Sequence, residues 1–255
     1  VRLKTGRCFY AQNIIAAMDI KETMDGLVGK NTVRHLDARY ANRISEVTMT
    51  PSAFTVSVGI DGAAPALDRL NVGYAVLTSG PDAFDNAYRA FRNNEMLLNH
   101  KEFYINIACT KTQDKRYTLV LQALPMPADF WIALRRENRA EYTRRKEEVA
   151  QVIVDIAQQY LVPHLRELIV VTDVATTATY RRYSGSPTGS VYDMACVPQN
   201  FGKNRIPLKT PIKGLYVPKF AHGVFGAMNS GLQAADLLTG GKVMNGNSRF
   251  GKRSR

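Results

Sequence analysis

Residues 214–238 combine features that could stabilise negative charge at one point of the fold. The run Gly214-Leu215-Tyr216-Val217 predicts a short buried strand, and the residues from Lys219 to Gly223 predict a turn. A helix is expected from Gly226 to Leu238. A helix that begins beside a turn presents free backbone N–H groups and the positive end of its dipole. This point therefore favours an anion or an electron-rich carbonyl group.

The expected helix is rich in small residues along its length. These are Gly226, Ala227, Ser230, Gly231, Ala234 and Ala235. Small side chains would let the helix approach another backbone or a flat ring closely. The same pattern also fits a tightly packed helix without a ligand, and residue spacing does not decide between the two.

Other predicted strands and helices must hold residues 214–238 in place. Two strands are expected around the turn Lys4–Arg7, the second of them at 11–17, followed by a helix that Asp19 caps and Gly29 closes. Alternating apolar residues at 54–60, 103–109 and 117–123 predict three strands of a mostly antiparallel sheet with one covered face.

Helical spacing predicts two further helices, at 82–93 and at 134–161. Pro163 ends the second one. Residues 176–211 are rich in glycine and proline but contain interspersed aromatic side chains, which favours an ordered, packed loop.

Motif-like segments resemble flavoproteins of the family of phytoene desaturase, carotenoid isomerase and retinol saturase. Residues 173–192 (DVATTATYRRYSGSPTGSVY) are similar to a family stretch that reads roughly ATPxTxxRYTGxPxGxxYG, and residues 210–216 resemble TPIxGLYL. Residues 222–236 resemble the last flavin motif, and residues 6–19 resemble a strand pair that reads dGxxxxADxVIxNxD. From about residue 34 to 133 only the general pattern is similar.

The resemblance implies an α/β fold in which a partial Rossmann-like FAD/NAD(P)-binding domain is interrupted by an α+β substrate domain with a mainly antiparallel sheet. The expected divisions are 1–34 and 202–245 for the flavin domain, 35–201 for the substrate domain and 246–255 for a basic tail. No GxGxxG follows a strand in this sequence. We therefore expect only a partial FAD site, with an N-terminal FAD-binding segment as its missing partner.

The resemblance also implies a function. The protein would be an FAD-dependent oxidoreductase that removes or adds hydrogen across a carbon–carbon bond. Its substrate would be an apolar compound of the isoprenoid, carotenoid or retinoid type. The residues implied at the flavin are His222, Gly223, Val224, Phe225, Gly226 and Ala227, and those implied at the substrate are Tyr183 and Tyr192. The alternatives are a flavin-dependent carotenoid-type isomerase, and a non-catalytic fragment or basic membrane-surface binding module.

Two side chains in the turn are candidates for a catalytic role. His222 could position a substrate or relay a proton beside a flavin, although a histidine in a glycine turn also serves packing. Lys219 could favour an anionic flavin or could lie on the surface at a strand end. His35, His100 and His164 have no motif around them and are expected to be structural.

The sequence departs from the family pattern at two places. Residues 217–220 (VPKF) stand where the family has an acid that meets the ribityl chain, and there is no acid between Asp193 and Asp236. Asp193 itself replaces a glycine that follows Tyr192. The ribityl contact and the substrate-side loop are therefore expected to differ.

Net charge and cysteine content limit which binding partners and which cellular compartment fit the sequence. The 255 residues carry a net charge of +12, concentrated at 201–219 and in the tail after residue 241. Such a tail is most simply a solvated terminus. Among functional interpretations, peripheral contact with anionic lipid headgroups is favoured over nucleic acid, because no nucleic-acid motif accompanies the basic residues. The three cysteines lie far apart, which argues against a metal site and for a reducing compartment. We expect a cytoplasmic protein.

Overall fold

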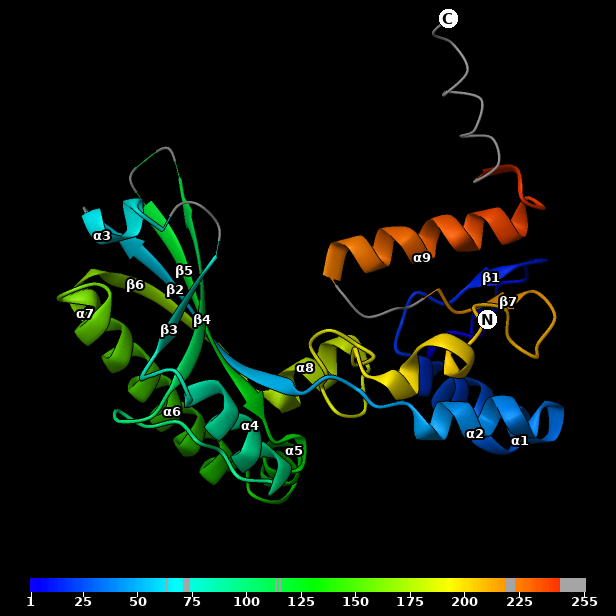
Figure 1. Ribbon diagram of the computed structural model, residues 1–255, viewed down its shortest axis with the longest axis horizontal. Helices are drawn as coiled ribbons and strands as arrows, with labels where there is room; N and C mark the ends of the chain where they lie inside the picture. The colour runs from blue at the N-terminus through cyan, green and yellow to red at the C-terminus, as the bar shows by residue number, and fades with distance from the viewer. Residues whose placement is uncertain (63, 71–73, 113, 115, 219–222, 244–255) are drawn as a thin grey trace, which may run out of the picture. The chain divides into compact units, whose positions relative to one another are not determined.

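The chain forms two compact units in the computed structural model, which describes residues 1–62, 64–70, 74–112, 114, 116–218 and 223–243 (Figure 1). One unit comprises residues 1–50, 184–187 and 192–255, and we call it the strand-pair unit. The other comprises 51–183 and 188–191, and we call it the sheet unit. Each unit has its own apolar core. Among the described residues, no helix is both long and apolar enough to cross a membrane.

The sheet unit is built on five antiparallel strands in the order β3-β4-β5-β2-β6. Their bounds are Ser52–Asp61 (β2), Ala75–Thr78 (β3), Tyr104–Lys111 (β4), Arg116–Met126 (β5) and Ile169–Ala175 (β6). The three strands predicted from alternation are confirmed as the centre of this sheet. The edge strands β3 and β6 were not predicted, because exposed side chains such as Val170 and Val171 blur the alternation there.

Helices complete the sheet unit, and α5 and α6 cover its apolar face. They are α3 (Pro65–Asp68), α4 (Ala83–Arg92), α5 (Ala128–Glu137), α6 (Arg139–Tyr160), α7 (Leu165–Leu168) and most of α8 (Thr177–Ser184). Phe54, Val56 and Val58 of β2 are fully buried in one cluster with Trp131 of α5 and Ile153 of α6. The opposite face of β2 is polar: Thr55 Oγ1 lies 2.6 Å from the hydroxyl of Tyr180. The apolar face is covered as predicted, but the opposite face is covered too at Thr55, which is buried.

The long helix predicted at 134–161 is wrong, because the segment is two helices. The helical conformation is interrupted at Asn138, whose backbone is extended at φ −143° and ψ 92°. Its side-chain oxygen accepts a hydrogen bond from the Glu141 N–H at 3.0 Å, which caps α6. A capping side chain thus starts a new helix inside a continuous helical pattern.

The packed loop predicted at 176–211 is wrong at its start, where α8 forms. Thr176 is fully buried, and its hydroxyl accepts a hydrogen bond from the Ala178 N–H at 3.2 Å. Thr179 Oγ1 accepts in turn from the Thr176 N–H at 3.2 Å. These two threonines satisfy two backbone N–H groups at the start of α8. The glycine and proline content of the region hides this helix start from sequence-based prediction.

The strand-pair unit is named for β1 (Ile14–Ile15) and β7 (Leu215–Tyr216), which pair in parallel. Its helices are the π-helical segment η1 (Glu22–Gly29), α1 (Lys30–Leu36), α2 (Ala38–Glu46), the short 3₁₀ turns η2 (Pro198–Asn200) and η3 (Gly202–Asn204), and α9 (Gly223–Leu238). Ile20, Met24, Ile44 and Val217 are buried in its core. The fold is mixed helix and sheet throughout.

The N-terminal predictions of this unit hold in part. Asp19 does cap the helix, since its Oδ1 accepts from the N–H groups of Lys21 and Glu22 at 2.8 and 3.0 Å. Gly29 closes that helix with φ 98°, although α1 follows it directly. The predicted N-terminal strands are wrong in extent, because β1 has two residues and the preceding segment makes a single bridge between Arg2 and Cys8.

Tyr40 carries a buried hydroxyl in the core of the strand-pair unit. It is 5% exposed, and among the described residues its hydroxyl has no hydrogen-bond partner. Burial, assisted by Asp37, raises the pKa of this hydroxyl well above its ordinary value. The folded protein therefore keeps the phenol proton at a pH where the unfolded chain releases it, so stability falls as pH rises above about 10.

We expect Tyr40→Phe to raise the free energy of unfolding by about 1 kcal/mol at neutral pH, because it removes an unsatisfied buried hydroxyl. The same change should make the loss of stability above pH of about 10 less steep. Urea unfolding at several pH values measures both effects. Tyr10→Phe is the matched control, because Tyr10 is 93% exposed. Equal behaviour of the two variants would contradict the prediction.

Candidate functional site

The candidate site begins where β7 runs beside β1. Leu215 lies opposite Ile14 and Tyr216 opposite Ile15. The Ile14 N–H donates to the Gly214 carbonyl at 2.7 Å, and the Ala16 N–H donates to the Tyr216 carbonyl at 2.8 Å. These bonds hold two segments that are far apart in the sequence as one parallel pair.

Gly214 makes this close approach feasible. Its φ is 81°, in the left-handed region that glycine adopts readily. A Cβ atom at this position would lie 2.4 Å from the carbonyl oxygen of Gln12. Any side chain here would therefore push β1 and β7 apart.

The first turns of α9 are fixed to the end of β7 by Ser230, which is 1% exposed. Its hydroxyl donates to the carbonyl of Pro218, at 2.8 Å, with the Ala227 carbonyl as a second acceptor at 3.0 Å. The end of the strand and the start of the helix are thus joined by one buried side chain.

The described part of the chain contains most of the residues predicted at the flavin. Gly223, Val224, Phe225, Gly226 and Ala227 are the first five residues of α9, so the helix starts three residues before the predicted position. The first N–H groups of a helix have no partner within it, and they lie at the positive end of its dipole. His222 and Lys219 lie outside the described residues.

One face of α9 is apolar and exposed. Phe225, Met228 and Leu232 are 81%, 63% and 48% exposed, and their spacing places them on one side of the helix. Ser230 and Ala234, on the other side, are each 1% exposed. The helix therefore packs through its small residues and leaves larger apolar side chains without cover.

The two tyrosines predicted at the substrate are both exposed. Tyr183, in the sheet unit, is 80% exposed, and the Arg182 guanidinium lies 5.6 Å from the centre of its ring. Tyr192, in the strand-pair unit, is 48% exposed, and its N–H donates to Thr50 Oγ1 at 3.1 Å.

Four residues of the motif-like segments have positive φ. Residues 185, 189, 193 and 214 have φ values of 73°, 62°, 67° and 81°. At Gly189 a Cβ atom would also lie 2.5 Å from the Thr177 carbonyl oxygen. Asp193 is not glycine, but aspartate tolerates a positive φ better than most residues.

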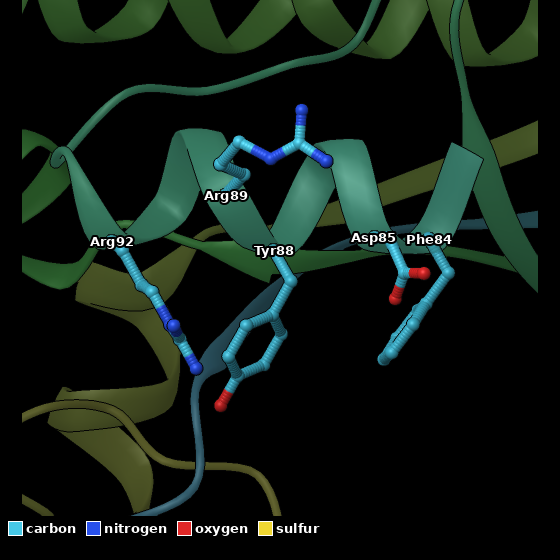
Figure 2. A pocket seen from close by; sticks show the side chains of 5 residues that line it. All are labelled: Phe84, Asp85, Tyr88, Arg89 and Arg92. Carbon is cyan, nitrogen blue, oxygen red and sulfur yellow. The ribbon is translucent and has the colours of Figure 1, made fainter. Parts of the chain in front are cut away.

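A hollow on α4 was not predicted from the sequence. It has a volume of about 260 Å³, and all of its lining residues come from this one helix. Figure 2 shows Phe84, Asp85, Tyr88 and Arg92 on one side of the helix, while Arg89 points away from them. The Arg92 guanidinium lies 5.4 Å from the centre of the Tyr88 ring. The hollow is a shallow feature of one helix surface.

Within the described ranges, no three histidine, cysteine, aspartate or glutamate side chains are grouped closely enough to hold a metal ion. Cys109 is buried, and burial raises the pKa of its thiol. No protein-family model matches the sequence, and a search of curated proteins finds no relative.

Proposed function

We propose that this chain forms the flavin-ring end of an FAD-dependent oxidoreductase that acts on carbon–carbon bonds of an apolar substrate of the isoprenoid, carotenoid or retinoid type. The observation that carries the proposal is the backbone conformation of the motif. Residues 185, 189, 193 and 214 occupy positions where the family has glycine, and all four have positive φ. The positive φ is most informative at Asp193, because residues other than glycine seldom adopt it.

The arrangement of β1, β7 and α9 gives further support. A Rossmann-like domain places a helix start at the end of a strand of a parallel sheet, and ligands bind there. In this chain the parallel pair of β1 and β7 leads into α9, and Ser230 holds the junction. We propose that this pair is the edge of the partial flavin domain.

The residues present fit one end of FAD. Residues 223–227 would offer backbone N–H groups to an electron-rich carbonyl and stabilise negative charge on it. Ala227 and Gly231 are small and exposed, and a Cβ added at Gly231 would meet nothing within 4 Å, so a flat ring can come close. FAD, when bound, supplies the redox chemistry.

The rest of FAD would be held elsewhere. The sequence between Asp193 and Asp236 has no acid for the ribityl chain, and the chain has no GxGxxG for the pyrophosphate. The exposed face formed by Phe225, Met228 and Leu232 is where we propose that the missing FAD-binding segment packs. The buried face of α9 then packs within the strand-pair unit, and its exposed face packs against the FAD-binding segment.

Product analysis separates the oxidoreductase from its closest competitor. Incubation with an apolar polyene and analysis by mass spectrometry should show loss or gain of two hydrogens per reacting bond. A flavin-dependent isomerase would leave the mass unchanged and alter only the geometry of the double bonds. If flavin is bound but neither the mass nor the double-bond geometry of the substrate changes, the chain catalyses neither oxidoreduction nor isomerisation of this class of compound.

A further inference from the structure

The sheet unit contains a second cavity, open to the solvent, with a volume of about 490 Å³, that is lined mainly by arginine. It lies between helices α5, α6 and α8, which can be followed in Figure 1. Its lining residues are Ile132, Arg135, Arg136, Arg139, Ala178, Arg181 and Arg182. Five guanidinium groups thus border one space of the size that small ligands occupy.

A buried tyrosine organises two of these arginines. Tyr142 is 5% exposed, and its hydroxyl lies 2.9 Å from Thr176 Oγ1. The guanidinium groups of Arg135 and Arg139 lie 6.0 and 5.8 Å from the centre of its ring. Arg135 also donates from Nη1 to the Ala178 carbonyl at 3.3 Å, which joins α5 to α8. This side of the cavity is therefore fixed by packing.

The charge of the cavity is largely uncompensated. Arg136 pairs with Glu137 at 2.6 Å, but no described carboxylate lies in ion-pair contact with the other four arginines. Elsewhere on α6 the situation differs, since Arg144 pairs with both Glu141 and Glu148. Like charges within about 10 Å repel one another, so an anion between them would be stabilised.

We propose that this cavity binds a small organic ligand that carries two phosphate groups. A guanidinium group matches phosphate oxygens in a two-point geometry, and four guanidinium groups without a described carboxylate in ion-pair contact suit two phosphates. Ile132 and Ala178 give an apolar contact for the organic part of the ligand. This proposal does not depend on the flavin proposal, because every lining residue belongs to the sheet unit.

Calorimetric titration with inorganic pyrophosphate tests the proposal. We expect Arg139→Gln and Arg182→Gln each to weaken binding about tenfold, and the double variant about 100-fold, because each removes a charge-assisted hydrogen bond. Arg145→Gln is the matched control, since it removes the same charge from α6 outside the cavity, and it should change affinity less than about twofold. If Arg139→Gln fails to fold, Arg181→Gln combined with Arg182→Gln replaces it, because both side chains are exposed.

Vesicles that contain a bisphosphorylated phosphoinositide identify the source of the phosphates. Vesicle binding that pyrophosphate competes away indicates a lipid headgroup, and pyrophosphate binding without vesicle binding indicates a soluble diphosphate. The proposal is wrong if pyrophosphate shows no saturable binding, or if Arg145→Gln weakens binding as much as Arg182→Gln. It is also wrong if a single-stranded RNA depends on these arginines while pyrophosphate does not bind.

Discussion

Replacing Trp131 with alanine is expected to lower the free energy of unfolding of the sheet unit by about 3 to 5 kcal/mol. Trp131 is fully buried, and its ring centre lies 5.3 Å from that of Phe54, 5.2 Å from that of Phe130 and 6.0 Å from that of Tyr142. Its removal would leave a cavity between β2, α5 and α6 that these aromatic rings cannot fill.

Urea unfolding followed by far-UV circular dichroism measures this loss, since Trp131 is the only tryptophan and its emission disappears with it. Trp131→Phe keeps an aromatic ring in place and should lose clearly less stability. Phe130→Ala is the matched control, because Phe130 belongs to the same helix but is 38% exposed. A loss in Trp131→Ala no larger than that in Phe130→Ala would show that Trp131 is not central to this core.

The second large effect is expected at Gly214, in the strand-pair unit. Alanine there would have to adopt φ 81°, which costs about 1 to 2 kcal/mol for a residue with a Cβ. The added atom would also meet the Gln12 carbonyl oxygen at 2.4 Å. We expect a total loss of about 2 to 4 kcal/mol, with β1 displaced from β7.

Hydrogen exchange measured by mass spectrometry localises this effect. The amides of Ile14 and Ala16, which donate to Gly214 and Tyr216, should lose protection in Gly214→Ala. Gly6→Ala is the matched control, because Gly6 has φ 85° and a Cβ there would meet nothing within 4 Å. Equal exchange at β1 in both variants would contradict the prediction that a side chain at position 214 separates β1 from β7.

The centre of the sheet could be predicted from the sequence because burial of one face imposes alternation on its strands. Phe54, Val56, Val58 and Ile60 are all buried, as this pattern requires. The edge strand β6 escaped prediction, since its exposed side chains are not under that constraint. Local hydrogen bonds also made helices hard to predict, since the cap formed by Asn138 divides a continuous helical pattern into two helices.

The candidate site could be predicted only in part. The start of α9 was predicted to within three residues, at Gly226 instead of Gly223. The pairing of β1 with β7 depends on a close approach of Gly214 to Gln12 that residue spacing does not reveal. The arginine cavity was missed for a related reason. Arg181 and Arg182 line the same cavity as Arg135 only because α8 forms, and α8 begins at a buried threonine inside a region whose composition is typical of a loop.

The most direct test of the flavin proposal is the absorption spectrum of the protein, expressed with whatever coding sequence its gene carries on either side of these residues. We expect bound flavin with an absorption band at about 450 nm, retained on gel filtration. Protein that shows no such band, and that takes up no FAD when the cofactor is added to it, would contradict the proposal that the start of α9 faces a flavin ring.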